Sequence, residues 1–477
     1  MAHVLCSNTG LTGIHRASLE LVTRLQGGGH RVTLASPRDV AAHEVPSSIE
    51  IVRIPGVRLS PAPQVERESS RALRKVTELR TARARRSMGV GRLGMESFAA
   101  LLGERRPDLV LLDLELHEHI TTALALGFRV ALISPFFGFD RRRGLPPLDS
   151  SIVPGRGLRG TKLGIEWAWA RARARQRLRS FRTWTRYFGT DRRGVLSEQM
   201  RREGVPRGVV RRSDWQALFS YRHVPLLSMT AREMDFPHGP APEFTYVGPM
   251  VHRGVERASA DREAQAVERV LQDARTARRR LVHASLSTMA GASAEWLDAL
   301  FHVARRRHDL SFVVGLGDRA QHERDLPGIG GAAPSNAHVF RWIPQLDVLA
   351  RASCSIHGGG IHTAHECVEL RVPQVVVPGR RFDQDGNAAR IESHGLGMRI
   401  AGPRATPDEL ERAIERALTN STMSEQIRAM ANAFESYRRD DVLLDAVDAC
   451  LRAAPLISRA RPSSGPSYGR SNSGSSQ

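Results

Sequence analysis

Glycines and polar side chains in the stretch 352–397 stand at spacings that suit a phosphorylated ligand. A short apolar run, 352–356, leads into three consecutive glycines that include Gly359 and Gly360, and a segment with helix composition, 363–370, follows. Glycine lets the backbone come close to a ligand, and the N–H groups and dipole of a helix N-terminus favour negative charge. A strand, a glycine turn and a helix in this order therefore predict an anion site.

The polar residues that follow this turn suit the hydroxyl groups of a sugar. Thr363 and Glu366 stand in the T-x-x-E relation of a capping box, so we expect the helix to begin at Thr363. Asp383 and Gln384 supply a carboxylate and an amide after the next buried-strand pattern, and Asn387 can be either a ligand or a structural residue. Phosphate donors followed by hydroxyl partners predict a nucleotide-sugar site.

Two residues upstream of the glycine turn could hold the nucleoside. Trp342 presents a flat face that suits stacking on a base, although burial in the core is the alternative for this side chain. Gln345 can bond to the edge of the base or to ribose, and Glu366 can accept hydrogen bonds from ribose hydroxyls. Thr363 and the N–H groups of residues 359–360 would then hold the diphosphate.

The order of these motifs resembles the donor-binding signature of the UDP-glycosyltransferase family, which includes bacterial antibiotic and glycolipid transferases and plant secondary-metabolite transferases. The match begins at a W-x-P-Q motif and continues in one register through Gly359-Gly360, Thr363, Glu366, Val372-Pro373, Asp383-Gln384 and Asn387. It covers about residues 2–450 and is specific from 340 to 400. The resemblance implies an α/β protein with the GT-B fold, in which two Rossmann-like doubly wound parallel-sheet domains face an interdomain cleft.

One departure from the family pattern concerns the phosphate ligands. Family members carry a histidine that bonds the pyrophosphate two residues before the position of Gly360, and that place is Gly358 here. Either His357 or His362 serves after a shift of the loop, or backbone N–H groups hold the phosphate alone. The resemblance also places the hydroxyl of Thr288 on the donor phosphate.

The N-terminal half opens with a strand, a helix over 15–25 and a second strand, which predicts a parallel sheet. The resemblance implies a catalytic base after the first strand, and His15 lies one place later than the family pattern expects. Asp113 ends a buried-strand pattern and would orient this histidine, as the acid does in a His-Asp pair. The alternatives are a helix-start histidine with no catalytic role and an aspartate that caps a helix. Three further residues compete with Asp113 for its role: Glu115, His117 and His119.

Composition limits the class of protein. The 477 residues are 41% hydrophobic and carry a formal charge of +20 with a pI near 11.2. Such a charge can indicate nucleic acid, an anionic membrane or anionic substrates, but few aromatics and no RNA-binding signature argue against specific nucleic-acid recognition. Four scattered cysteines, no signal-peptide pattern and no long apolar run favour a cytoplasmic protein without structural metal.

The pattern divides the chain into an acceptor-binding domain (1–240), a linker (241–278), a donor-binding domain (279–455) and a serine- and glycine-rich tail (456–477) that we expect to be disordered. The segment 163–188 has apolar residues at helical spacing with arginines between them. It is either a basic amphipathic helix that lies on an anionic membrane, with the protein peripheral at its inner face, or an ordinary surface helix with its apolar face on the core.

The residues and the resemblance together predict an inverting, metal-independent glycosyltransferase that needs no cofactor. It would move a hexose from a UDP- or dTDP-sugar to a hydroxyl of a small molecule or a lipid, with His15 as base and Asp113 as its partner. The alternative is a catalytically decayed GT-B homologue that binds nucleotide sugars or activates a partner.

Overall fold

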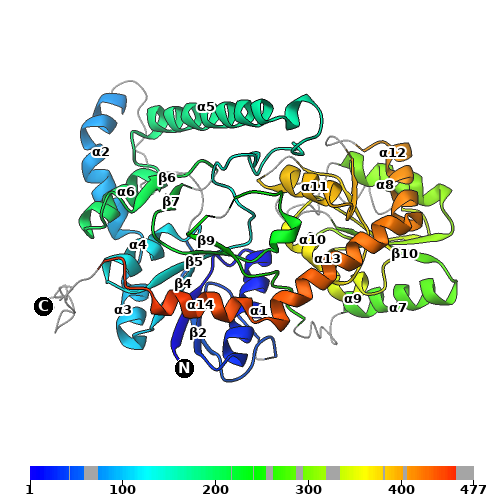
Figure 1. Ribbon diagram of the computed structural model, residues 1–477, viewed down its shortest axis with the longest axis horizontal. Coiled ribbons are helices and arrows are strands. Elements are labelled where there is room, and N and C mark those ends of the chain that lie inside the picture. The colour runs from blue at the N-terminus through cyan, green and yellow to red at the C-terminus, as the bar shows by residue number, and fades with distance from the viewer. Residues whose placement is uncertain are drawn as a thin grey trace, which may run out of the picture.

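The structure is a computed structural model that describes residues 1–41, 43–57, 74–215, 218–239, 241–253, 262–285, 294–317, 333–379, 382–400 and 405–457, with the backbone alone for 74–80 and 294–296. Two predictions from the sequence concern residues outside these ranges: the phosphate ligand Thr288 and the tail, of which 458–477 are not described. The described chain folds around two parallel sheets that lie side by side (Figure 1).

The N-terminal sheet has seven strands in the order β3-β2-β1-β4-β5-β8-β9, and all its pairs are parallel. Its central strands are continuous apolar runs because helices cover both faces. The strands are β1 (His3–Ser7), β2 (Arg31–Ser36), β3 (Glu50–Arg53), β4 (Leu109–Asp113), β5 (Val130–Ser134), β8 (Leu226–Ser228) and β9 (Phe244–Tyr246). A small antiparallel pair, β6 (Val210–Arg212) and β7 (Phe219–Tyr221), stands apart from this sheet.

Helices surround this sheet, and the first of them, α1, turns its buried face toward it with Ile14, Ala17, Leu21 and Leu25. The helices of this half are α1 (Thr12–Gly27), α2 (Arg74–Gly91), α3 (Glu96–Arg105), α4 (His117–Ala125), α5 (Lys162–Tyr187) and α6 (Arg192–Arg202), with short 3₁₀ turns η1 (Leu158–Gly160) and η2 (Arg232–Met234). Strand β9 extends the sheet beyond residue 240, where the sequence pattern placed the linker.

The C-terminal sheet has six strands in the order β12-β11-β10-β13-β14-β15, again all parallel. The strands are β10 (Arg280–Ser285), β11 (Leu310–Gly315), β12 (Ala337–Phe340), β13 (Cys354–His357), β14 (Gln374–Val376) and β15 (Gly397–Arg399). The helices of this half are α7 (Arg262–Thr276), α8 (Ala294–Arg306), α9 (Gln345–Leu349), α10 (Ile361–Glu369), α11 (Gln384–Ser393), α12 (Pro407–Thr419), α13 (Ser421–Arg439) and α14 (Val442–Arg452). None of the described helices is both long enough and apolar enough to cross a bilayer.

The last helix returns to the first domain. Helix α13 runs along the C-terminal domain and α14 lies against α1 (Figure 1). Leu443, Val447 and Cys450 of α14 belong to the same buried cluster as Leu21 and Leu25 of α1. The core of the first domain is therefore completed by the end of the described chain.

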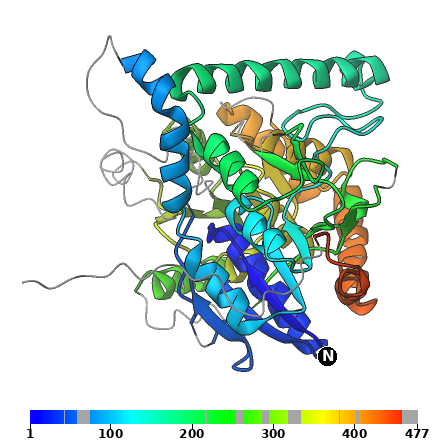
Figure 2. The same cartoon turned by 90° about the vertical axis from the view of Figure 1, so that its left-hand side faces the viewer.

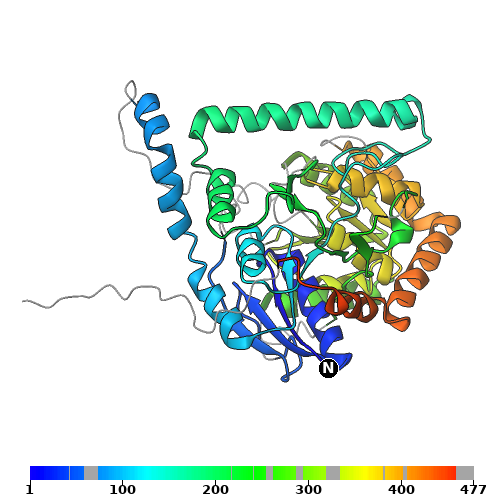
Figure 3. The same cartoon turned by 60° about the vertical axis from the view of Figure 1, so that its left-hand side comes forward.

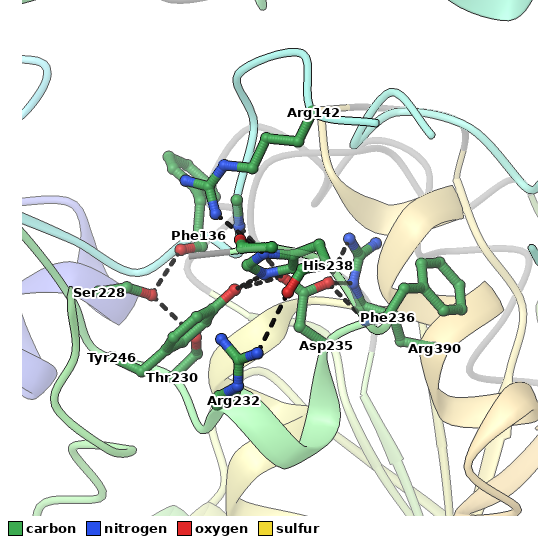
Figure 4. A network of polar contacts seen from close by, with 12 residues as sticks. Phe136, Arg142, Ser228, Thr230, Arg232, Asp235, Phe236, His238, Tyr246 and Arg390 are labelled. Atoms are coloured by element: carbon green, nitrogen blue, oxygen red, sulfur yellow. Dashed lines mark hydrogen bonds and ion pairs between the residues drawn. The ribbon is translucent and has the colours of Figure 1, made fainter. Parts of the chain in front are cut away.

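A buried ion pair joins the two domains. The Arg390 guanidinium of α11 donates from Nε to Asp235 Oδ1 at 2.7 Å, and neither side chain is exposed to solvent. The same guanidinium lies between the rings of Phe137 and Phe236, 4.7 and 4.6 Å from their centroids. The Tyr246 hydroxyl donates to the second carboxylate oxygen of Asp235 at 2.5 Å (Figure 4). We call these residues the interdomain clamp.

Candidate functional site

The strand orders place a possible ligand crevice at one point in each sheet. Chain order reverses direction between β1 and β4 in the first sheet and between β10 and β13 in the second. Ligands of doubly wound proteins bind at such switch points, outside the carboxyl ends of the strands. The segment after β13 is the glycine turn, His15 lies in the segment after β1, and Asp113 is the last residue of β4. Topology thus brings the predicted site residues to the two expected edges.

The turn after β13 ends at an open helix N-terminus. Helix α10 has Gly360 as its N-cap, so the cap residue has no side chain that could accept a hydrogen bond from the first turn. A side chain added at Gly360 would meet only open space. The prediction of a helix start at Thr363 with a capping box is wrong, because α10 begins at Ile361 and both Thr363 and Glu366 lie inside it. The uncapped N–H groups make this turn a suitable site for an anion.

Thr363 and Glu366 instead share a partner from α9. The side-chain amide of Gln345 donates to Thr363 Oγ1 at 3.3 Å and to the carboxylate of Glu366. Burial raises the pKa of Glu366, while the bond from Gln345 lowers it. We call these three residues the α9–α10 cluster. Three residues predicted to touch the nucleoside and phosphate are thus in contact at the start of α10.

His357 and Gly359 have roles that differ from the predicted ones. The His357 ring is buried in β13, where Nε2 lies 2.9 Å from Gln374 Oε1 and Nδ1 accepts the Gly359 N–H at 3.1 Å. Both ring nitrogens are occupied within the protein, and so is the Gly359 amide that we expected to hold a phosphate. This difference follows from the one-residue offset in the sequence. His357 stands one residue before the family position, so it is still part of β13 and its ring bonds to the neighbouring strand.

The two predicted sugar ligands lie at the start of α11, close to the glycine turn. Asp383 and Gln384 are both buried, and the Gln384 amide oxygen accepts the N–H of Gly379 at 3.0 Å. Asn387 donates to the carboxylate of Asp383 at 2.7 Å and to the carbonyl of Gly359 at 3.0 Å. Burial raises the pKa of Asp383 to about 6, against the lowering effect of Asn387. Asn387 therefore has the structural role, and it ties α11 to the turn.

The stacking residue Trp342 precedes α9 and is half-buried, so its ring is neither free in solvent nor fully inside the core. Its backbone N–H donates to Glu263 of α7 at 3.2 Å. The assignment of Trp342 as a base-stacking residue therefore stays a prediction.

The structure does not join the predicted catalytic pair by a hydrogen bond. Asp113 accepts from the hydroxyl and the N–H of Thr9, at 2.8 and 3.2 Å, and from the N–H of Glu115 at 3.1 Å. His15 is buried in the first turn of α1, and its Nδ1 has no partner among the described residues. Burial, with help from the Arg38 charge, lowers the pKa of His15 to about 4. The imidazole is therefore neutral near pH 7, the state in which it can accept a proton.

Of the three residues that compete with Asp113, two are tied up in the core. His117 Nδ1 lies 2.8 Å from the Tyr221 hydroxyl, and the ring of His119 packs on Phe98 at 4.2 Å. Glu115 is only half-buried, and its carboxylate forms no hydrogen bond with the described residues. Burial and then the charge of Asp113 raise the pKa of Glu115 to about 7. This carboxylate is a second candidate base.

Sequence reasoning missed a contact between the two helix N-termini. Gly13 of α1 packs directly on the His362 ring of α10, so no larger residue fits at this position. Arg16, one turn further along α1, lies close enough for its charge to act on both His362 and Glu366. Burial and then Arg16 lower the pKa of His362 to about 4, and Arg16 opposes the burial that raises the pKa of Glu366. The only sequence signal was the position of Arg16 next to His15. This arginine brings positive charge from the first domain to the α9–α10 cluster of the second.

Comparisons with known proteins agree with this architecture. A sequence model described as "Erythromycin biosynthesis protein CIII-like, C-terminal domain" matches residues 311–438. The NDP-glycosyltransferase YjiC of Bacillus subtilis is 28% identical over 97 residues, 20% of this chain and 24% of that protein. UDP-glucuronosyltransferase 1A8 of Rattus norvegicus is 32% identical over 108 residues, 21% of this chain and 20% of that protein. The chain thus spans about a quarter or less of the length of these curated relatives.

Solved structures match over nearly the whole chain. The glycotransferase of kitacinnamycin has a TM-score of 0.63 at 20% identity, with 94% of this chain and 99% of that chain covered. The calicheamicin glycosyltransferase CalG4 has a TM-score of 0.56 at 18% identity, over 94% and 98% of the two chains. Glycosyltransferase VinC, solved with dTDP, gives 0.56 at 17% identity, over 94% and 100%. The predicted GT-B fold and the resemblance to UDP-glycosyltransferases are confirmed.

Proposed function

We propose that this protein is a glycosyltransferase that moves a hexose from a UDP- or dTDP-sugar to a hydroxyl of a small molecule or a lipid, with inversion and without a metal or another cofactor. The observation that carries the proposal is the open N-terminus of α10 at Gly360 beside the α9–α10 cluster. Names of similar proteins, including the NDP-glycosyltransferase YjiC, support the same class of reaction.

Different site residues bind different parts of the donor. The N–H groups of the first turn of α10 face the diphosphate, and Arg16 adds a positive charge near the leaving group. Gln345 and Glu366 bind the ribose end, and Asp383 and Gln384 face the hexose. An ordered set of buried polar partners rejects sugars that lack a matching hydroxyl, because its own groups are then left unpaired.

The base removes the proton from the acceptor hydroxyl as the oxygen attacks the anomeric carbon and the NDP leaves. His15 is our candidate, because it is neutral near pH 7 and its Nδ1 has no partner among the described residues. Asp113 supports this region through Thr9 and would reach His15 only after a change of hydrogen bonds.

A donor panel tests this proposal. Calorimetry with UDP and dTDP should detect binding, and Glu366→Ala should weaken it by roughly ten- to hundredfold because a charged hydrogen-bond acceptor is lost. Glu425→Ala on α13, an exposed position, is the matched control and should bind like the natural chain. Release of nucleotide from UDP- and dTDP-sugars with a set of hydroxyl acceptors then measures transfer. Absence of nucleotide binding would refute the proposal.

Two observations favour the second candidate, a catalytically decayed homologue that binds nucleotide sugars or activates a partner. Asp113 is bonded to Thr9 rather than to His15, and the His357 ring is occupied by Gln374 and Gly359. A homologue of this kind would bind the nucleotide in calorimetry and release none from any sugar donor. Turnover that disappears in His15→Gln, with nucleotide binding intact, would exclude it.

A further inference from the structure

The long helix α5 presents an apolar stripe to solvent. Residues at helical spacing share one side of it, and their exposed fractions are 82% for Leu163, 74% for Trp167, 50% for Leu178, 61% for Phe181 and 52% for Trp184. Buried side chains, Ile165 and Trp169, lie on the opposite side. The interpretation of 163–188 as a surface helix with its apolar face on the core is therefore wrong for this stripe.

The position of α5 leaves the stripe open. In all three views the helix forms the outer edge of the molecule and stands clear of both sheets (Figures 1, 2 and 3). Contacts that hold its inner side include the pairing of Arg173 with both oxygens of Asp214 at 3.0 Å and the bond from the Trp169 indole to the Leu145 carbonyl at 2.7 Å. A well-anchored helix with a large exposed apolar face needs a partner for that face.

Arginines lie along one edge of the stripe and within it. With 3.6 residues per turn, Arg171, Arg175 and Arg182 follow one edge, and Arg177 lies within the stripe between Phe181 and Trp184. All of these side chains are exposed, and none of them forms a salt bridge with a described residue. The one acidic residue of α5, Glu166, is paired with Arg141. The unpaired charges of α5 along the stripe are therefore all positive.

We propose that α5 docks flat on an anionic lipid bilayer, with its apolar stripe among the acyl chains and its bordering arginines at the phosphate groups. Tryptophan and phenylalanine on the apolar face, with arginines beside them, form the pattern of helices that lie in the membrane interface. The 26 residues of α5 give a contact line of about 39 Å. The proposal does not depend on the transfer reaction.

Charge favours a bilayer over a second copy of this chain. Pairing two α5 helices would bring their arginines together in water, and Glu166, the one acidic residue of α5, is already paired with Arg141. An anionic membrane instead attracts each arginine near its surface. The formal charge of +20 over the whole chain acts in the same direction.

Co-sedimentation with vesicles tests the proposal. The protein should bind vesicles of phosphatidylcholine mixed with phosphatidylglycerol, bind poorly to phosphatidylcholine alone, and dissociate at high salt. Arg171→Gln/Arg175→Gln/Arg182→Gln should weaken binding to the anionic vesicles by about tenfold or more. The matched control removes three exposed arginines from α12 and α13, Arg412→Gln/Arg416→Gln/Arg428→Gln, and should keep most of the affinity. Equal loss in both variants would show attraction by net charge alone and would overturn the docking of α5.

A second measurement reports on the apolar stripe itself. Trp167 and Trp184 are exposed, so their fluorescence should shift to shorter wavelength on anionic vesicles and be quenched by brominated acyl chains. Trp167→Ser/Phe181→Ser should abolish vesicle binding while the circular dichroism spectrum and melting temperature stay unchanged, because both side chains are in solvent. Unchanged binding by this variant would overturn the proposal. A dimer in ultracentrifugation that the same variant disrupts, with no vesicle binding, would overturn it in favour of a second copy.

Discussion

The two candidate bases, His15 and Glu115, differ in their charge environment. His15 has Arg38, Arg16, Glu44 and His252 around it, and burial is the main cause of its low pKa of about 4. Glu115 lies beside Asp113, Glu118 and Arg192, and burial raises its pKa to about 7. Only a deprotonated group can act as a general base, so each predicts a different acid limb of the rate profile.

The pH dependence of kcat/KM should therefore identify the base. With His15 as base, activity should stay level from pH 8 to about pH 5 and fall as the pH drops through about 4. His15→Gln should then reduce kcat by about 10²–10⁴-fold with nucleotide affinity unchanged. Activity that is lost as the pH falls through about 7, and that loses this limb in Glu115→Gln, would assign the role to the carboxylate instead.

Asp383 should make stability depend on pH. Its folded-state pKa of about 6 lies above its ordinary value of 3.8, so the folded protein binds the proton more tightly than the unfolded chain does. Its contribution is fully present below pH 3.8 and is lost as the pH rises through 6, a change of roughly 3 kcal/mol. Urea unfolding of Asp383→Asn should show a flatter dependence between these values than the natural chain. Parallel curves would show that this carboxylate is not buried in solution.

At the residue scale, the sequence predicted which side chains gather at the site better than it predicted their partners. Gln345, Thr363 and Glu366 were each expected at the donor, but a bond between them depends on how α9 packs on α10. The saturation of His357 by Gln374 was also out of reach, because the two lie on neighbouring strands whose register only the folded sheet defines.

The two glycines of the turn are needed for different reasons, one for stability and the other for binding. Gly359 has φ of +82°, and a Cβ there would lie 2.9 Å from the Gln384 carbonyl oxygen and 3.1 Å from a Val376 methyl group. Gly360 has φ of −64° and open space where its Cβ would be. The first glycine is required by the backbone, and the second faces the place of the proposed diphosphate.

Alanine should therefore affect stability at Gly359 and nucleotide binding at Gly360. Gly359→Ala should lower the free energy of unfolding by about 1–3 kcal/mol, from backbone strain and close contacts. Gly360→Ala should leave stability unchanged and weaken UDP or dTDP binding by roughly tenfold, because a methyl group stands before the helix N-terminus. Chemical denaturation and calorimetry on both variants measure the two effects. Normal nucleotide binding by Gly360→Ala would place the phosphates elsewhere.

Elements with strong local patterns were predictable, and their ends were not. Buried apolar runs gave β1, β4 and β10 because parallel strands covered on both faces need them. The T-x-x-E pair at Thr363 did not form a capping box, whereas Thr406 and Glu409 do, with Pro407 at the first position of α12. A box needs its threonine outside the helix, and only the folded turn decides that. The break at Asp441, which has φ of 48° between α13 and α14, has no sequence signal.

At the scale of the whole molecule, the interdomain clamp holds the two sheets in one arrangement. Burial alone would raise the pKa of Asp235, but the charge of Arg390 and hydrogen bonds from His238 and Tyr246 hold it below its ordinary value. The clamp lies at α11, the helix whose N-cap is Asp383. The position of the sugar ligands relative to the first domain therefore depends on it.

Breaking the clamp on one side should be costly. Arg390→Met leaves the Asp235 carboxylate buried without its partner and should lower the free energy of unfolding by about 3–5 kcal/mol. Arg390→Met/Asp235→Asn should lose less, because both charges are gone. The control is the exposed pair of Arg306 and Asp408, 2.9 Å apart, where Arg306→Met should cost at most about 1 kcal/mol. Urea unfolding measures all three, and equal losses at the two pairs would show that the clamp is hydrated in solution.

The return of α14 to α1 has a consequence for biosynthesis. As the chain leaves the ribosome, the strands and helices of the first domain appear early, but the side chains that cover Leu21 and Leu25 of α1 lie in Val442–Arg452. A Cβ atom at Gly28 would lie 2.5 Å from a methyl group of Leu444, so α14 packs closely against this end of α1. The nascent first domain therefore keeps part of its apolar surface uncovered until residues 442–452 have been translated.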